Sequence, residues 1–253
     1  MTFIPGLVSI SFRNLKPKEI IQACRESGLK AIEWGGDVHV PAGQIDAAST
    51  VRDATDKAEL GMPEYGSYYR IGQSDPAEIE GVVRSAKALD AAVIRVWAYC
   101  KNRQDCSAEE YENAVRDAKR ICDAFPGMTF CLECHNNTLT EDYHDALRFL
   151  EDVDRPSLNM FWQPNQFRTH AYNLEACAAL LPYIRAVHVF SWEGTDGKNV
   201  MFPLEHHAKR WSEYISILRN APVGELPMML EFMHDGRPES LPDTAKTLFD
   251  WIG

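Results

Sequence analysis

The chain is predicted to fold as a single (β/α)8 barrel, also called a TIM barrel. Eight short, apolar, β-rich runs alternate with eight amphipathic segments within 253 residues, which is the pattern of parallel strands covered by helices. Eight repeats in about 250 residues match the usual size of this barrel. No linker, low-complexity stretch or change in composition divides the chain, so residues 1–253 are expected to form one domain.

A doubly wound α/β sheet is the rival arrangement. The turn after its first strand normally carries a Gly-rich sequence that binds a nucleotide. The corresponding segment here, Ser9–Leu15, contains no glycine. The barrel is therefore favoured.

The strands are predicted where β-branched and aromatic residues form short apolar runs. These runs are Leu7–Phe12, Lys30–Trp34, Glu64–Tyr69, Ala92–Trp97, Met128–Cys134, Ser157–Trp162, Ile184–Phe190 and Pro227–Phe232. The amphipathic segments between them predict helices over Pro17–Ser27, Gln44–Leu60, Pro76–Leu89, Ala108–Ala124, Glu141–Glu151, Leu174–Leu181, His207–Asn220 and Leu241–Trp251.

Local signals support several helix ends. Ser107 precedes Glu110 with the spacing of a capping box, and Asp75-Pro76 places proline at a helix start. Gly28 and Gly61 follow the first and second helices, where a left-handed residue commonly ends a helix.

The acidic composition excludes some classes of partner. The net charge is −11 and the sequence pI is about 5.2, so the chain repels phosphate backbones and nucleic-acid binding is not expected. No run of 18 apolar residues is present, and the N-terminus lacks a basic segment before its apolar stretch. A cytoplasmic location without membrane association is expected.

Seven scattered cysteines suit reduced thiols, and Cys131 and Cys134 should point to opposite faces of one strand.

Four polar residues stand at the ends of the last four predicted strands. They are Glu133, Gln163, His188 and Glu231. The carboxyl ends of barrel strands meet at one mouth, where barrel enzymes carry their chemistry. Two carboxylates, an imidazole and an amide carbonyl around one point form a credible site for a divalent cation.

Two of these residues, Glu133 and His188, also have a structural explanation when each is considered alone. Glu133 faces inward by strand alternation, and a salt bridge to an interior arginine such as Arg95 would account for its burial. A lone interior histidine such as His188 is usually only hydrogen-bonded. Glu231 lies between Leu230 and Phe232, where a carboxylate is unexpected unless it faces a site.

The pattern resembles the xylose isomerase-like TIM barrels, which include sugar isomerases, ketose 3-epimerases and the endonuclease IV group. The segments that carry the resemblance are AIEWGGDVHVP, LECHNN, AVHVFSW and MLEF. The resemblance implies one divalent metal held by Glu133, the position of Gln163, His188 and Glu231. The family usually has aspartate where this chain has Gln163, so metal affinity should fall; the alternatives are that Asn165 fills the position or that no metal binds.

The resemblance also implies a mechanism and a cofactor. Glu133 and Glu231 would serve both as metal ligands and as the acid/base pair that moves a proton through an enediolate. Oxygen ligands with one histidine favour Mn²⁺ or Mg²⁺, with Co²⁺ or Zn²⁺ as alternatives. The expected activity is that of an isomerase or epimerase acting on a sugar, a sugar phosphate or a keto-polyol.

Five residues near the predicted strand ends are candidates for substrate binding. They are His39, Trp97, His135, Asn165 and Lys198, the last on a loop that could close over the site. The adjacent pair His206 and His207 is expected to start a helix and not to share a metal.

Two other functions remain open at this stage. One is a barrel that binds a sugar or regulates without catalysis, because Gln163 weakens the metal site. The other is a nuclease of the endonuclease IV type, which would need more His and Asp ligands than the chain offers. The partner is expected to be a small sugar or sugar phosphate. The oligomeric state is open, with a homodimer the commonest arrangement for soluble enzymes.

Overall fold

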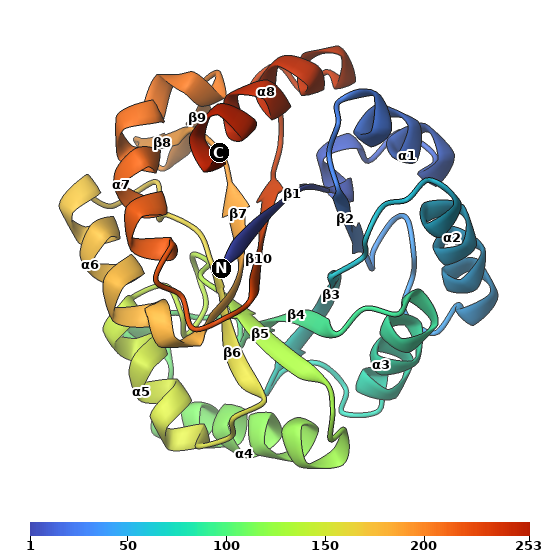
Figure 1. Cartoon of the computed structure of the whole chain (residues 1–253). Coiled ribbons are helices and arrows are strands. Elements are labelled where there is room, and N and C mark those ends of the chain that lie inside the picture. The colour runs from blue at the N-terminus through green and yellow to red at the C-terminus, as the bar shows by residue number, and fades with distance from the viewer.

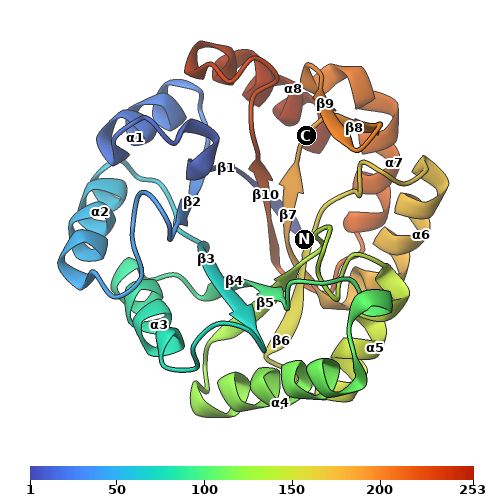
Figure 2. The same ribbon diagram turned by 180° about the vertical axis from the view of Figure 1, so that it is seen from behind.

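Eight parallel strands close into a barrel in the order β1-β10-β7-β6-β5-β4-β3-β2. The computed structural model describes all 253 residues. The strands lie at the centre and the helices form a ring around them (Figures 1 and 2). The predicted TIM barrel is therefore confirmed.

The elements follow the predicted strand–helix alternation. The barrel strands are β1 (Thr2–Val8), β2 (Ala31–Gly35), β3 (Glu64–Ile71), β4 (Val93–Ala98), β5 (Thr129–Glu133), β6 (Leu158–Trp162), β7 (Ile184–Val189) and β10 (Glu225–Leu230). The helices are α1 (Pro17–Glu26), α2 (Ile45–Lys57), α3 (Glu78–Leu89), α4 (Ala108–Ala124), α5 (Tyr143–Val153), α6 (His170–Leu180), α7 (Ala208–Leu218) and α8 (Leu241–Ile252). Short 3₁₀ helices are η1 (Ser9–Phe12), η2 (Arg103–Asp105), η3 (Leu181–Tyr183), η4 (Leu204–His207) and η5 (Pro238–Ser240).

The apolar core has an outer and an inner part. The outer part joins the barrel to the helices and contains 63 buried residues, whereas a separate cluster of 7 includes Ala31, Cys131, Phe161, Ala186 and Met229. The inner cluster is small because polar side chains occupy much of the space enclosed by the strands. Cys131 belongs to the inner cluster and Cys134 packs against the outer one, so the two thiols point to opposite faces as expected.

The first strand and the sixth helix begin earlier than predicted. β1 starts at Thr2 and runs through Pro5, because the carbonyl of Pro5 accepts a hydrogen bond from Lys30 N at 2.8 Å. The predicted strand residues Ser9–Phe12 instead form η1, a buried turn at the end of β1. Helix α6 starts at His170, where Thr169 caps it by accepting from Tyr172 N.

The segment predicted as a mobile loop around Lys198 is a β-hairpin. Strands β8 (Trp192–Thr195) and β9 (Lys198–Met201) pair antiparallel. Asp196 and Gly197 join them with φ values of 50° and 73°, as a two-residue turn of the Asp-Gly kind requires.

No helix is both long and apolar enough to cross a membrane.

Glu64 at the start of β3 is a buried acid without a partner. The residue is fully buried, and neither carboxylate oxygen has a hydrogen bond. Burial and the nearby carboxylate of Glu33 raise the pKa of Glu64 well above its ordinary value. The folded state therefore holds this proton more tightly than the unfolded chain does, and Glu64 reduces stability as the pH rises above about 4.3.

Glu64→Gln is expected to stabilise the protein in a pH-dependent way. Because Gln does not titrate, the gain in free energy of unfolding over wild type should grow by about 1.4 kcal/mol per pH unit, starting above the unfolded pKa and continuing to the folded pKa. Urea unfolding at pH 5, 6 and 7 measures this gain. Glu112→Gln, at a side chain 69% exposed, is the control and should show no such trend. A gain for Glu64→Gln that does not change with pH would contradict the assignment.

Candidate active site

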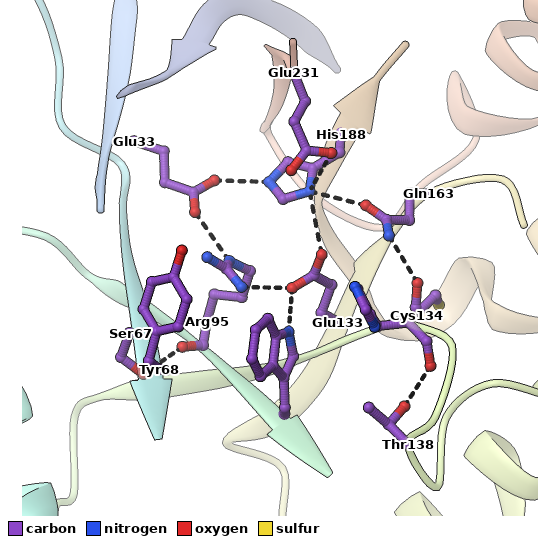
Figure 3. A network of polar contacts seen from close by, with 12 residues as sticks. Glu33, Ser67, Tyr68, Arg95, Glu133, Cys134, Thr138, Gln163, His188 and Glu231 are labelled. Atoms are coloured by element: carbon purple, nitrogen blue, oxygen red, sulfur yellow. Dashed lines mark hydrogen bonds and ion pairs between the residues drawn. The ribbon is translucent and has the colours of Figure 1, made fainter. Parts of the chain in front are cut away.

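Four polar side chains meet at the carboxyl-terminal mouth of the barrel. Glu133 ends β5, Gln163 follows β6, His188 lies in β7 and Glu231 follows β10. The Nδ1 atom of His188 lies 2.9 Å from Oε1 of Gln163, 3.7 Å from Oε1 of Glu133 and 3.6 Å from Oε2 of Glu231. Figure 3 shows the two carboxylates and the amide gathered around this nitrogen. We call these four residues, which the sequence singles out, the strand-end cluster.

The spacing within the strand-end cluster fits ligands of a single cation. Two ligand atoms at about 2.1 Å from one ion, at angles of about 90–120°, lie about 3.0–3.6 Å apart. The distances around Nδ1 of His188 span 2.9–3.7 Å. One imidazole nitrogen with carboxylate and amide oxygens is a donor set suited to Mn²⁺ or Mg²⁺. The residues present therefore fit a divalent cation.

The hydrogen bonds of Gln163 determine which way its amide faces. Its Nε2 donates to the carbonyl oxygen of Cys134 at 2.9 Å. A carbonyl can only accept, so the amide nitrogen must face Cys134 and the amide oxygen must face His188. The oxygen is the atom that a hard cation would bind, but it contributes no charge to the cluster.

Glu33 in β2 holds the opposite side of the His188 ring. Nε2 of His188 donates to Oε2 of Glu33 at 2.9 Å, and both side chains are fully buried. Figure 3 shows this carboxylate across the ring from the other acids. A carboxylate that accepts from one ring nitrogen fixes the tautomer and leaves the other nitrogen available as a ligand.

Arg95 in β4 links Glu33 to Glu133. Its Nε donates to Glu33 at 3.0 Å and its Nη1 donates to Oε2 of Glu133 at 2.5 Å. Trp97 Nε1 donates to the same oxygen of Glu133, so the other oxygen remains free to face the cluster. Gly66 provides the space, because a Cβ there would lie 2.4 Å from Glu33 Oε1 and 2.9 Å from Arg95 Nη2. The salt bridge to Arg95 and the convergence on one point thus use different oxygens of Glu133.

The buried charges shift the pKa values in this network. Burial by itself would lower the pKa of His188, but the carboxylates of Glu231 and Glu33 raise it to about 10. Burial opposes ionisation of Glu133, yet Arg95 keeps the pKa of Glu133 below its ordinary value. Burial raises the pKa of Glu231. With this raised pKa, both ring nitrogens of His188 carry a proton at neutral pH. Nδ1 would therefore have to lose its proton before it could serve as a metal ligand.

A pocket of about 500 Å³ opens onto the strand-end cluster. Trp97, Trp192 and Phe232 contribute apolar and aromatic surface, which suits the faces of a small ring compound. His135 also lines the pocket, and its Nδ1 lies 2.7 Å from the carbonyl oxygen of Asn136. That nitrogen must donate, so in neutral His135 the proton-accepting nitrogen is Nε2, which has no hydrogen-bond partner in the protein.

The five predicted substrate-binding residues divide into two groups. Trp97, His135 and Asn165 line the pocket, whereas His39 and Lys198 do not. His39 is buried and bonded on both ring nitrogens, to Ser9 Oγ and to the carbonyl of Leu15. Lys198 is exposed on the hairpin, and its neighbours Gly197 and Asn199 line the pocket instead. His39 and Lys198 therefore lie outside the lining of this pocket.

Sequence reasoning missed Glu33, and it did not assign Arg13 to the site. Glu33 stands between Ile32 and Trp34 in a buried strand, which is the same signal that identified Glu231. Arg13 lines the pocket from the segment after η1. That segment is not a strand, so no alternation in the sequence shows which way the Arg13 side chain points.

A second group of possible ligands lies beside the hairpin. Atoms of Glu193, His206 and His207 lie within 4.8 Å of one another, so the two adjacent histidines do approach one point. His206 and His207 end the 3₁₀ helix η4 and do not lie in the α-helix that follows it. Glu193 already accepts from His207 and from Arg210 at 2.8 Å. The guanidinium beside this carboxylate disfavours a cation there.

The sequence matches the family model described as xylose isomerase-like TIM barrel over residues 21–252. The chain belongs to the xylose isomerase-like TIM barrel family. One relative is the 3-dehydroshikimate dehydratase of Bacillus anthracis. It is 25% identical over 217 residues, which cover 78% of this chain and 75% of the relative. That relative is an enzyme, and it is a dehydratase, not an isomerase.

Solved structures of the xylose isomerase-like barrels share the fold. The probable 3-DHS dehydratase AsbF from Bacillus anthracis aligns with a TM-score of 0.80 at 22% identity, covering 98% of this chain and 99% of that one. A xylose isomerase-like barrel from Mycobacterium smegmatis in complex with magnesium aligns with a TM-score of 0.70 at 14% identity, over 100% and 98% of the chains. IOLI protein with a bound zinc atom aligns with a TM-score of 0.73 at 16% identity, over 100% and 98% of the chains.

Arg95→Met is expected to destabilise the fold strongly. Removing the guanidinium leaves the buried carboxylates of Glu33 and Glu133 without their cation, which typically costs about 3–5 kcal/mol in free energy of unfolding. The loss should be smaller at pH 4 than at pH 7, because both pKa values are lowered in wild type and the unpaired acids can take up protons in the variant.

Arg116→Met is the matched control, since Arg116 forms an exposed pair with Glu112 at 3.8 Å and should change stability by less than about 0.5 kcal/mol. Chemical denaturation of both variants measures the difference. Equal effects would mean that the Arg95 network does not stabilise the barrel.

Proposed function

We propose that this chain is a metal-dependent dehydratase of a small polyhydroxylated keto acid of the 3-dehydroshikimate type. The observation that carries the proposal is the juxtaposition, in one pocket, of Glu133, Gln163 and Glu231 of the strand-end cluster with the free Nε2 of His135. The dehydratase relative from Bacillus anthracis supports this choice of reaction.

Glu133, Gln163, His188 and Glu231 would hold the divalent cation. When bound, such a cation polarises a carbonyl oxygen and acidifies the hydrogen on the neighbouring carbon. The magnesium and zinc in the two structural neighbours support a metal in this chain. Gln163 contributes no charge, so the site is less negative than one with aspartate at that position. Modest affinity for the metal is therefore predicted.

His135 would move the proton. Its neutral imidazole accepts the hydrogen of the carbon next to the carbonyl at Nε2, while Nδ1 stays bonded to Asn136. The electron pair of the broken C–H bond becomes a new C=C bond, and the C–O bond on the next carbon breaks. The departing oxygen takes the proton back from Nε2 and leaves as water. His135 is then neutral again and ready for another cycle.

Glu133 is a weaker candidate for the base than the sequence predicted. One of its oxygens is bonded to both Arg95 and Trp97, and its lowered pKa reduces its basicity. The facing oxygens of Glu133 and Glu231 lie within 4.8 Å of one another. That separation suits two ligands of one ion better than two bases on opposite faces of a substrate.

The isomerase or epimerase activity that the sequence predicted is the alternative function. Two acids converge at the site, and removal of a proton beside a carbonyl is common to both reactions. They differ in whether a hydroxyl leaves. Incorporation of deuterium from D₂O into a ketose without loss of water would favour the alternative.

His135→Asn is expected to abolish most of the dehydratase activity. The Mn²⁺-loaded wild type should convert 3-dehydroshikimate to a dihydroxybenzoate, which forms when the keto product of the elimination enolises. The ultraviolet absorbance of the new aromatic ring measures the reaction. Loss of the general base should lower kcat about 10²- to 10⁴-fold, while binding of shikimate, which has a hydroxyl in place of the keto group, should persist.

His144→Asn is the control, because His144 is 71% exposed and does not line the pocket; its activity should equal that of wild type. Full activity in His135→Asn would remove His135 from the mechanism. No product from the wild type would overturn the dehydratase proposal.

A further inference from the structure

Two guanidinium groups border the pocket, those of Arg13 and Arg95. Arg95 is 2% exposed and is committed to the carboxylates of Glu33 and Glu133. Arg13 is 43% exposed, and no lysine borders the pocket. Arg13 is therefore the permanently charged cation that a substrate in this pocket can reach.

The guanidinium of Arg13 is held in place on one side and free on the other. Nη1 donates to the carboxylate of Asp37, and Nη2 donates to the hydroxyl of Tyr68 at 2.7 Å. These partners come from the segment after β2 and from β3, so they fix the group relative to the barrel. A guanidinium has five N–H donors, and three of those on Arg13 have no partner in the protein. A fixed fork with free donors is suited to a carboxylate.

Tyr68 connects Arg13 to the buried network. Its hydroxyl accepts from Arg13, and its ring centroid lies 5.8 Å from the guanidinium carbon of Arg95. Arg95 in turn contacts Glu133 of the strand-end cluster. Arg13 and three residues of the strand-end cluster, Glu133, Gln163 and Glu231, also line the same pocket of about 500 Å³, so a substrate in that pocket is bordered by both.

The usual place for a phosphate in this fold carries no positive charge here. Barrel enzymes frequently bind phosphate with the loops after the seventh and eighth barrel strands. Those loops contribute Trp192, Gly197, Asn199, Glu231 and Phe232 to the pocket, and none of these residues is positively charged. Lys198 on the same hairpin is exposed and lies outside the pocket lining.

We propose that Arg13 binds a carboxylate of the substrate and thereby makes the pocket selective for polyhydroxylated monocarboxylic acids over neutral sugars and sugar phosphates. The proposal deepens the proposed function and rests on it, since it assumes that the reacting carbon lies at the strand-end cluster. Asp37 and Tyr68 are positioning residues that orient the fork of Arg13.

Calorimetric titration of the Mn²⁺-loaded protein with shikimate and with shikimate methyl ester tests the proposal. Wild type should bind the acid more tightly than the ester, because only the acid offers a carboxylate. Arg13→Gln should weaken binding of the acid about 10- to 100-fold, as expected for loss of charge-assisted hydrogen bonds, and binding of the ester by less than about threefold. Arg13→Lys keeps the charge but not the forked donors. Its affinity for the acid should lie between those of wild type and Arg13→Gln.

Two variants serve as controls. Arg52→Gln removes an arginine of similar exposure, 39%, that is also paired with an aspartate but lies on α2; it should bind as wild type does. Lys198→Gln should also bind as wild type does, and a loss there comparable to that in Arg13→Gln would assign recognition to the hairpin. Unfolding temperatures of all variants identify any that fail to fold, in which case Arg13→Lys decides.

The outcomes separate this proposal from the proposed function. If shikimate binding depends on Arg13 but wild type forms no dihydroxybenzoate, the dehydratase assignment fails and carboxylate recognition stands. If acid and ester bind wild type equally, or if Arg13→Gln weakens both equally, Arg13 does not recognise a carboxylate. Tighter binding of a sugar phosphate such as fructose 6-phosphate than of shikimate would also overturn the proposal.

Discussion

The guanidinium of Arg95 is the interaction on which the candidate active site depends. It bonds the carboxylates of Glu33 and Glu133 inside the barrel, and these two acids approach His188 from opposite sides. Buried carboxylates are tolerated only when they are paired. Removing Arg95 would leave several acids competing for one imidazole. Pairing with Arg95 therefore allows Glu33 and Glu133 to be buried at the barrel mouth. It also leaves Nδ1 of His188 facing Gln163 and Glu231.

Strands and loops contribute differently to the pocket. The strand-end cluster and its supporting network come from strands or the residues directly after them, so neighbouring strands fix their positions. Arg13, His135 and the hairpin Trp192–Met201 come from connecting segments. In barrel enzymes such segments vary between relatives while the strands stay constant. The candidate metal ligands thus come from the strand ends, whereas the residues proposed to select the substrate and to move its proton come from the loops.

The barrel and three residues of the strand-end cluster, Glu133, His188 and Glu231, follow from simple periodicity in the sequence, whereas Gln163 was assigned through the family resemblance. Alternation along a strand places Glu133 and His188 inward, and parallel strands bring their ends to one mouth. Glu33 carried the same signal but lay outside the four strands considered. Lys198 and Arg13 could not be placed, because loop direction depends on tertiary contacts such as the Asp196-Gly197 turn. The charge network was only partly foreseen, since pairing between distant strands is not visible in local sequence.

The most direct test of the account is the metal content of the protein after loading with Mn²⁺ and removal of excess ion, measured by atomic emission. Wild type is predicted to retain close to one ion per chain, and Glu231→Gln far less, because the variant loses a charged ligand. Glu193→Gln, in the group beside the hairpin, should retain as much as wild type. No bound metal in wild type, or an equal loss in Glu193→Gln, would contradict a metal site at the strand-end cluster.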